Sequence, residues 1–337
     1  MSDTARRLPA ALAAVADACR VTRAVQANMQ RVARIVKDDR SPVTVADFAS
    51  QAVVARRLRE ALGTPPLLVA EETSAFLRNP ENTAHLDATL AAAQEAWPEA
   101  DVPTLLDAID DGASDTHHAG FWTLDPIDGT KGFLRGQQYA VSLAYVERGE
   151  VVLGVLGCPN LPLDFSQPLD RPDRHGSVYY AVRGAGAFEL TGDKLRESPR
   201  RVTRLDHAPD EPVSVCMSVE DAHTSADGVA AVLARLSAMG VPTREPARLD
   251  SQAKYAVVAR GQADAYLRLP TKKGYVELIW DHAAGALIAH EAGCAVTDID
   301  GRALDFSRGR RLEKNRGIVA APPALHGKLL SAIKATA

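Results

Sequence analysis

The sequence lacks a net positive charge, a long apolar run and closely spaced cysteines. Its 337 residues carry 39 Lys and Arg against 43 Asp and Glu, a formal charge of −4, which offers no global field to attract RNA or DNA. No apolar run reaches the roughly 20 residues that span a bilayer. We therefore expect no nucleic-acid polymer and no membrane as partners. The composition, 46% hydrophobic and 24% charged, is that of a globular enzyme, which we expect to be a monomer.

The cysteine pattern predicts buried, reduced thiols in a cytoplasmic protein, because no Cys-x-x-Cys pair occurs. The four cysteines are Cys19, Cys158, Cys216 and Cys294. Near the N-terminus, Arg6-Arg7 and the apolar stretch that follows imitate an export signal. Asp17 interrupts that stretch, however, and apolar positions continue at helical spacing beyond it. We therefore predict a structural helix over residues 5–37.

The first part of the chain changes from helical to β-rich patterns. Ser41–Asp47 is expected to break the helical pattern, because the residue before Pro42 avoids helical geometry. Residues 75–120 are rich in alanine and acidic residues, which predicts a helical insertion at the surface. The other predicted elements are a helix over 48–62, strands over 67–70 and 121–124, and hairpins over 139–158 and 178–190.

Charges and prolines in residues 191–212 predict a domain boundary. We expect an α+β N-terminal domain over residues 1–200, which holds metal, and a C-terminal domain over 201–337, which binds substrate. In the second part strands alternate with helices, a pattern that favours an α/β fold. The predicted strands are 213–217, 265–269, 295–297 and 317–320, and the predicted helices are 229–238, 251–260, 279–292 and 324–335.

The most informative segment is Asp125-Pro-Ile-Asp-Gly-Thr130. It follows a strand-like run, so both carboxylates should emerge at a strand end, where open sheets place ligand sites. Pro126 fixes the backbone between the carboxylates and Gly129 permits a tight turn. Thr130 should begin a helix whose free N–H groups can bind an anion. Divalent metals beside amide donors suit a phosphate ester.

Acidic residues also stand at strand or helix ends elsewhere, namely Asp47, Glu71-Glu72 and Asp281. Each alone could be a solvated surface carboxylate or a helix cap. Asp125 and Asp128, however, have apolar neighbours, where an unpaired carboxylate is unfavourable. Asp281 begins an apolar helix, whose dipole should favour the ionised form. Oxygen ligands of this kind suit Mg²⁺.

Rate arithmetic also favours metals over a metal-free mechanism. Hydrolysis of a phosphate monoester can require up to ~10²¹-fold acceleration, whereas one positioned acid or base contributes ~10²–10⁴-fold. Two metal ions about 3.5–4 Å apart can stabilise both the attacking and the leaving oxygen. An acid-rich pocket without cations would repel the substrate instead.

Two motifs together, Asp125-Pro-Ile-Asp-Gly-Thr130 and Trp280-Asp-His-Ala-Ala-Gly285, resemble the metal-dependent, lithium-sensitive inositol monophosphatase superfamily. The resemblance covers nearly the whole chain and is poorest over 75–120. It implies a layered α/β/α/β/α sandwich. Further segments are similar to the 3′(2′),5′-bisphosphate nucleotidase branch of the superfamily: Ser41-Pro-Val-Thr44, Gly129-Thr-Lys-Gly-Phe-Leu-Arg-Gly136, Gly157-Cys-Pro-Asn160, Leu249-Asp-Ser-Gln-Ala-Lys-Tyr255 and Tyr266-Leu-Arg-Leu-Pro270.

The resemblance implies two Mg²⁺ ions per site, with a third, looser ion as an option. One would be held by Glu71, Asp125 and the carbonyl of Ile127, and the second by Asp125, Asp128 and Asp281.

By the same resemblance, Asp47 and Thr130 would activate the attacking water, and Glu72 would polarise the neighbourhood. Lys254 and Arg268 would grip the phosphate that is not hydrolysed. The full set of implied substrate-binding residues is Gly129, Thr130, His223, Ser251, Lys254 and Arg268.

The implied reaction removes the 3′-phosphate of adenosine 3′,5′-bisphosphate (PAP), giving AMP and phosphate. Its sulfated analogue PAPS is expected to react as well, and the role would be to clear a by-product of sulfate assimilation. Alternatives at this point are an inositol polyphosphate 1-phosphatase, a sugar monophosphatase, or a catalytically silent nucleotide sensor.

Overall fold

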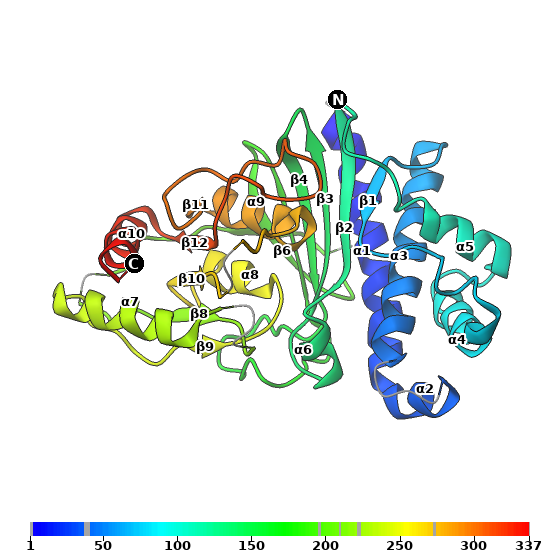
Figure 1. Cartoon of the computed structure of the whole chain (residues 1–337), viewed down its shortest axis with the longest axis horizontal. Helices are drawn as coiled ribbons and strands as arrows, with labels where there is room; N and C mark the ends of the chain where they lie inside the picture. The colour runs from blue at the N-terminus through cyan, green and yellow to red at the C-terminus, as the bar shows by residue number, and fades with distance from the viewer. Residues whose placement is uncertain are drawn as a thin grey trace.

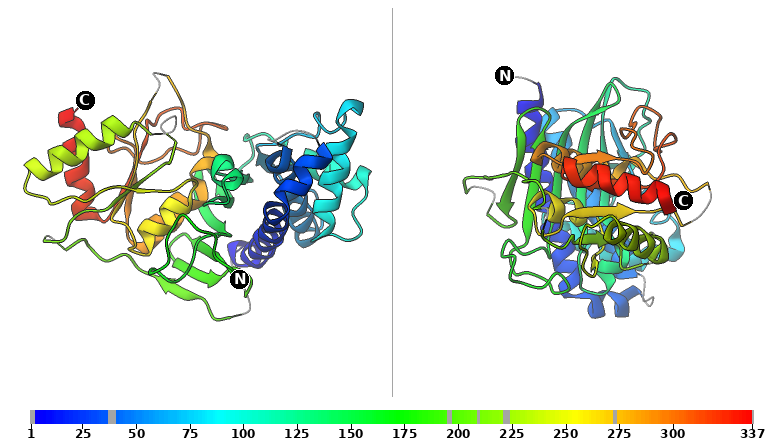
Figure 2. Two further views of the ribbon diagram at one scale, coloured as in Figure 1. Left: turned by 90° about the horizontal axis from the view of Figure 1, so that it is seen from below. Right: turned by 90° about the vertical axis from the view of Figure 1, so that its left-hand side faces the viewer.

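The protein folds into five alternating layers of helices and sheets (Figures 1 and 2). The computed structural model describes residues 3–36, 41–194, 197–208, 210–220, 224–271 and 274–336. From one side to the other, the layers are helices α1 and α3, a seven-stranded sheet, helices α8 and α9, a five-stranded sheet, and helices α7 and α10. The predicted α/β/α/β/α sandwich is therefore confirmed.

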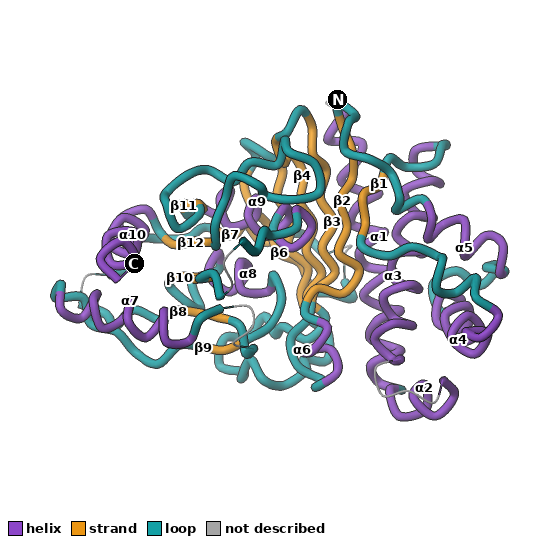
Figure 3. The backbone as a smooth tube through the Cα atoms, in the orientation of Figure 1, coloured by secondary structure: helices purple, strands orange, loops and turns teal. Residues whose placement is uncertain are grey.

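The seven-stranded sheet lies at the centre of the molecule and follows the chain order β1 to β7 (Figure 3). Only the β1–β2 pair is parallel, and the other pairs are antiparallel. Arg148 and Gly149 both have positive φ angles, 51° and 81°, which suits the tight turn between β3 and β4. The strands are β1 Leu68–Ala70, β2 Gly120–Asp128, β3 Ala140–Glu147, β4 Glu150–Cys158, β5 Ser177–Val182, β6 Gly186–Thr191 and β7 Arg200–Val202.

Alanine-rich helices cover one face of this sheet. Fully buried alanines such as Ala14 and Ala52 allow α1 and α3 to pack closely against each other and against the sheet. Helices α4 and α5 from the predicted insertion pack on α3. The helices on this side are α1 Asp3–Ala27, α2 Met29–Val36, α3 Ser41–Leu62, α4 Thr83–Gln94 and α5 Val102–Asp110, with a 3₁₀ turn over Pro80–Asn82.

Two predictions for the N-terminal helices are wrong. The helix expected over 5–37 ends at Ala27 and a second one begins at Met29. The side chain of Asn28 donates a hydrogen bond to the carbonyl of Ala24 (2.9 Å), and such local bonds compete with helical continuation. The segment expected to break the helix instead forms the start of α3, because proline is tolerated in a first helical turn.

The C-terminal half supplies the remaining three layers. Helix α9 lies between the two sheets, and small side chains permit this: a Cβ on Gly285 would lie 2.3 Å from the Tyr255 ring. The five-stranded sheet has the order β11-β12-β10-β8-β9. Its strands are β8 Val215–Met217, β9 Ala247–Arg248, β10 Ala265–Arg268, β11 Ala295–Thr297 and β12 Ile318–Ala321, and the helices are α7 Ala226–Ala238, α8 Ala253–Ala259, α9 Ala283–Ala292 and α10 Pro323–Thr336.

Several boundaries differ from the sequence predictions. The strand expected over 121–124 continues to Asp128, so Asp125 lies within β2 rather than beyond its end. The helix expected over 279–292 begins as the 3₁₀ turn η2, Ile279–Asp281, and continues as α9. Strands β7 and β9 were not predicted, because three and two residues are too short to show a pattern. The domain division at residue 200 stays a prediction.

All four cysteines are buried and unpaired, as predicted. In the described ranges, no helix has both the length and the apolar composition needed to cross a bilayer.

Candidate functional site

The tight turn predicted at Gly129 follows directly after β2. Asp125 is 3% exposed and accepts a hydrogen bond from the backbone N–H of Ile127 (3.1 Å). The β2–β3 pairing is irregular between Asp125 and Asp128. Gly129 follows with φ 89° and ψ 44° in the left-handed region, and a Cβ there would lie 2.9 Å from that of Ser251. Glycine is therefore required both for the turn and for the close approach of Ser251.

Helix α6, Thr130–Leu134, follows the turn and is too short to be stable alone. Phe133 anchors it: its side chain is fully buried, and its ring packs edge-on against Tyr139 at 5.0 Å between centroids. Burial of a phenylalanine contributes about 1.5–3 kcal/mol. Packing of Phe133 thus holds Thr130 in place directly after Asp128 and Gly129.

Five acidic side chains from four separate elements come together beside this turn. Asp47 lies on α3, Glu71 directly follows β1, Asp125 and Asp128 belong to β2, and Asp281 ends η2. Burial, followed by repulsion from each of the other four acids, raises the pKa of Asp125 well above its usual value. The fold therefore gathers carboxylates that are far apart in the sequence, as predicted.

The predicted metal-binding and substrate-binding residues in the described ranges line one cavity of about 580 Å³. Asp47 is buried and is not among the residues that line this cavity; burial, followed by Glu72 and Glu71, raises the pKa of Asp47 well above its usual value. His223 falls outside the described residues, so its prediction is not tested. The predicted residues lining the cavity are Glu71, Asp125, Ile127, Asp128, Gly129, Thr130, Ser251, Lys254, Arg268 and Asp281.

The acid cluster fits hard divalent cations. Burial, Glu72 and Asp128 raise the pKa of Glu71 to about 7. The helix dipole was expected to favour ionised Asp281. Instead, burial and the neighbouring acids raise the pKa of Asp281 well above its usual value, although Arg268 acts in the opposite direction. Without bound metal, the carboxyl groups of this cluster therefore resist ionisation. Carboxylate oxygens and a backbone carbonyl are the donors that Mg²⁺ prefers, and cations would relieve the repulsion.

Cationic and hydroxyl groups come from the C-terminal half of the chain. Lys254 on α8 is 2% exposed; its ammonium donates to the carbonyl of Leu249 (3.2 Å) and lies 5.3 Å from the centroid of the Tyr266 ring. Arg268 on β10 is 9% exposed. Ser251 has a positive φ of 71°, an uncommon backbone conformation for a residue other than glycine.

Sequence reasoning missed two residues that support the site, Gln252 and Glu277. The backbone N–H of Gln252 donates to Asp128, and its side-chain amide donates to the carbonyl of Trp280 (2.8 Å), so Gln252 joins two acid-bearing segments. Glu277 pairs with Arg268. Gln252 stands inside a motif already singled out, whereas nothing in the local pattern marks Glu277.

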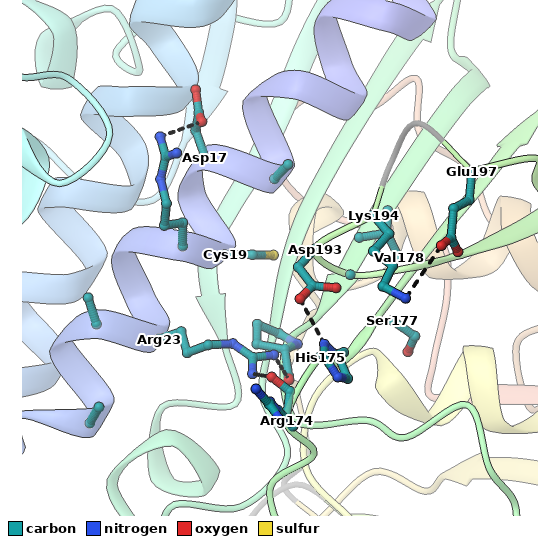
Figure 4. A pocket seen from close by; sticks show the side chains of 16 residues that line it. Asp17, Cys19, Arg23, Arg174, His175, Ser177, Val178, Asp193, Lys194 and Glu197 are labelled. Carbon is teal, nitrogen blue, oxygen red and sulfur yellow. Dashed lines mark hydrogen bonds and ion pairs between the residues drawn. The ribbon is translucent and has the colours of Figure 1, made fainter.

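A larger cavity of about 880 Å³ lies between α1, strand β5 and the segment that follows β6, and none of these acids lines it (Figure 4). Most of its lining charges are paired with one another: for example, His175 contacts Asp193 at 2.7 Å and Lys194 contacts Glu197 at 3.4 Å. Arg23 donates to backbone carbonyls, including that of Asp173 (3.0 Å). Because most charged groups among the described residues of this lining are paired with one another, this cavity is not the candidate site despite its size.

Comparison with known proteins agrees with this geometry. A family model described as the inositol monophosphatase family matches residues 7–336. A 3′(2′),5′-bisphosphate nucleotidase from Schizosaccharomyces pombe is 42% identical over 315 residues, with 89% of this chain and 86% of that protein covered. One from Emericella nidulans is 42% identical over 330 residues, with coverage of 91% and 92%.

Among solved structures, CysQ from Bacteroides thetaiotaomicron, a bacterial member of the inositol monophosphatase family, superposes with a TM-score of 0.60. It is 22% identical and covers 93% of this chain and 96% of its own, so it bears on the fold alone. With the family model matched from end to end and relatives at 42% identity, the chain belongs to the inositol monophosphatase family.

Proposed function

We propose that the protein is a Mg²⁺-dependent 3′(2′),5′-bisphosphate nucleotidase, which removes the 3′-phosphate of PAP to give AMP and phosphate. The observation that carries this proposal is the mixed lining of one cavity. It holds the carboxylates of Glu71, Asp125, Asp128 and Asp281 together with the cationic side chains of Lys254 and Arg268. A substrate with two phosphates suits such a cavity, because one phosphate requires cations among the acids and the other meets fixed cationic side chains.

For the metals, we assign one Mg²⁺ to Glu71, Asp125 and the carbonyl of Ile127. A second belongs to Asp125, Asp128 and Asp281, and a third ion would be bound more loosely. When bound, these ions neutralise phosphate charge and make water a better nucleophile. Two observations support this assignment. The ligands are carboxylate and carbonyl oxygens, and the pKa of Asp125 is raised, mainly by burial.

In the chemical step, water attacks phosphorus while the bond from phosphorus to the 3′-oxygen of the ribose breaks. Asp47 and Thr130 orient the water, and the Asp47 carboxylate takes its proton. The raised pKa of Asp47, caused first by burial, supports a role as proton acceptor. The 3′-oxygen leaves with the bonding electron pair and takes a proton from a water molecule, which completes AMP. Asp47 then gives its proton to the hydroxide that remains, so the site is regenerated.

For substrate recognition, Lys254 and Arg268 hold the 5′-phosphate, Gly129 and Thr130 contact the reacting phosphate, and Ser251 approaches the nucleoside, with His223 proposed beside it. Burial lowers the pKa of Lys254, while the negative charges of Asp128 and a bound phosphate favour its charged form. PAPS is expected to react at the same site, which would place the enzyme among reactions that clear by-products of sulfate assimilation.

We further infer a monomer that works in the cytoplasm. The four buried, unpaired thiols support a reducing compartment.

A phosphate-release assay with and without Mg²⁺ tests the function. We expect release from PAP in Mg²⁺ and little in EDTA, with inositol 1,4-bisphosphate much poorer as a substrate. Faster release from inositol 1,4-bisphosphate would point to an inositol polyphosphate 1-phosphatase instead. Tight PAP binding by calorimetry without phosphate release would point to a nucleotide sensor.

A further inference from the structure

The guanidinium group of Arg268 forms a two-point ion pair with the carboxylate of Glu277. The Nε of Arg268 donates to one carboxylate oxygen (2.8 Å), and an Nη lies 2.7 Å from the other. Glu277 is 5% exposed and Arg268 is 9% exposed. A bidentate pair of this kind fixes both the position and the plane of the guanidinium.

The pair belongs to a longer buried network. The Nε2 atom of His282 lies 3.4 Å from Glu277, and its Nδ1 lies 2.9 Å from the Tyr255 hydroxyl. The Tyr255 ring packs edge-on against Tyr266 at 4.9 Å between centroids. Tyr266 is the ring that faces the Lys254 ammonium. The network therefore connects the residues that contact Lys254 and Arg268.

Glu277, Asp281 and His282 are also near enough to one another to hold a metal ion. The contacts argue against that role for Glu277, because each of its carboxylate oxygens already lies within 2.8 Å of an Arg268 nitrogen. A metal there would have to displace the guanidinium.

We propose that Glu277 is the positioning residue for Arg268 and thereby sets the preference for substrates that carry a second phosphate. This inference rests on the proposed function, since it assigns Arg268 to the 5′-phosphate. With its Nε and one Nη engaged by Glu277 and with hydrogen bonds to Tyr266 and Tyr275, the guanidinium of Arg268 meets a ligand in one fixed orientation. The carboxylate restricts where the second phosphate can bind.

If only the charge of Glu277 mattered, its substitution would lower KM for PAP, which is the opposite of what positioning predicts. Removal of the negative charge of Glu277 would leave Arg268 unneutralised and strengthen attraction for phosphate. Loss of positioning weakens binding instead, because the guanidinium no longer meets the phosphate in a fixed geometry. The direction of the change in KM therefore separates the two accounts.

The test compares KM for PAP with KM for adenosine 3′-monophosphate, which lacks the 5′-phosphate, in saturating Mg²⁺. Glu277→Gln removes the charge at nearly constant size, and Glu277→Asp keeps the charge but shortens its reach. We expect both variants to raise KM for PAP on the order of tenfold, because that is the effect of losing about one hydrogen bond to a charged group. KM for the monophosphate and kcat should change little.

A matched control is Glu189→Gln. Glu189 is 2% exposed and pairs with Arg200 on neighbouring strands of the first sheet, outside the cavity. We expect both Glu189→Gln and Glu277→Gln to lower Tm. Unlike Glu277→Gln, Glu189→Gln should leave both KM values unchanged. In an Arg268→Ala background, Glu277→Asp should have no further effect on KM for PAP, because the side chain that it positions is gone.

A lower KM for PAP in Glu277→Gln, or unchanged KM ratios in both Glu277 variants, would overturn the inference. If Glu277→Gln does not fold, Glu277→Asp decides alone. Failure of the proposed function gives a different result: the wild-type protein would then release no phosphate from PAP, or would show equal KM for the two nucleotides.

Discussion

Glu71 allows the metal site to be tested through stability as well as turnover. Burial, Glu72 and Asp128 raise its pKa from 4.5 to about 7 in the metal-free chain. At about 1.4 kcal/mol per pKa unit, ionised Glu71 would destabilise the fold by roughly 3 kcal/mol. Because part of the Glu71 side chain is exposed at the cavity, screening reduces this to about 1–2 kcal/mol.

The sign follows from proton binding. A pKa that is higher in the folded state means that protonated Glu71 contributes stability below about pH 4.5, and that this contribution is lost as pH rises through 7. Glu71→Gln cannot ionise, so it avoids the loss. In EDTA we expect the variant to be more stable than wild type by about 1–2 kcal/mol at pH 8 and equally stable at pH 4.

Mg²⁺ should reverse the order of stability. A ligand at about 100 times its Kd stabilises a protein by about 2.7 kcal/mol, and the variant lacks one of the proposed donors. Urea denaturation at pH 4 and pH 8, in EDTA and in Mg²⁺, measures all four cases. Glu95→Gln, an exposed residue at the end of α4, is the control. A variant less stable than wild type in EDTA at pH 8, or no reversal in Mg²⁺, would refute the reasoning.

Three further substitutions test individual parts of the site. Asp125→Asn should lower kcat by at least ~10²-fold, more than loss of a residue that only orients a metal ligand; a wild-type rate would remove Asp125 from the metal site. Lys254→Ala should raise KM for PAP by about tenfold or more and KM for adenosine 3′-monophosphate little, and equal effects would place Lys254 away from the 5′-phosphate. Gly129→Ala should destabilise the protein by roughly 1–2 kcal/mol, because of its positive φ and the approach of Ser251; an unchanged Tm would contradict the proposed turn strain.

The acid-bearing turn could be predicted from sequence because its geometry is local. Pro126 restricts the backbone, Asp125 accepts a hydrogen bond from the N–H of Ile127, and Gly129 permits the φ of 89° that the tight turn requires. The approach of Asp47 and Asp281 to this turn is a property of the whole fold. The family resemblance implied it, whereas no pattern within α3 or η2 could.

What the sequence did not reveal depends on contacts between distant or weakly patterned residues. In the sequence, Glu277 looks like an ordinary charged residue, and its proposed role follows only from its pair with Arg268 on β10. Strand β9 has two residues, which carry no periodicity. The break at Asn28 depends on one side-chain hydrogen bond within an otherwise helical pattern.

The central claim is that Glu71, Asp125, Asp128 and Asp281 together bind divalent cations beside the reacting phosphate. Anomalous diffraction from crystals soaked with Mn²⁺ and AMP would test it most directly. We expect at least two anomalous peaks among these four carboxylates, with the Ile127 carbonyl at one of them. Mn²⁺ bound elsewhere, with these carboxylates lacking metal, would contradict the account.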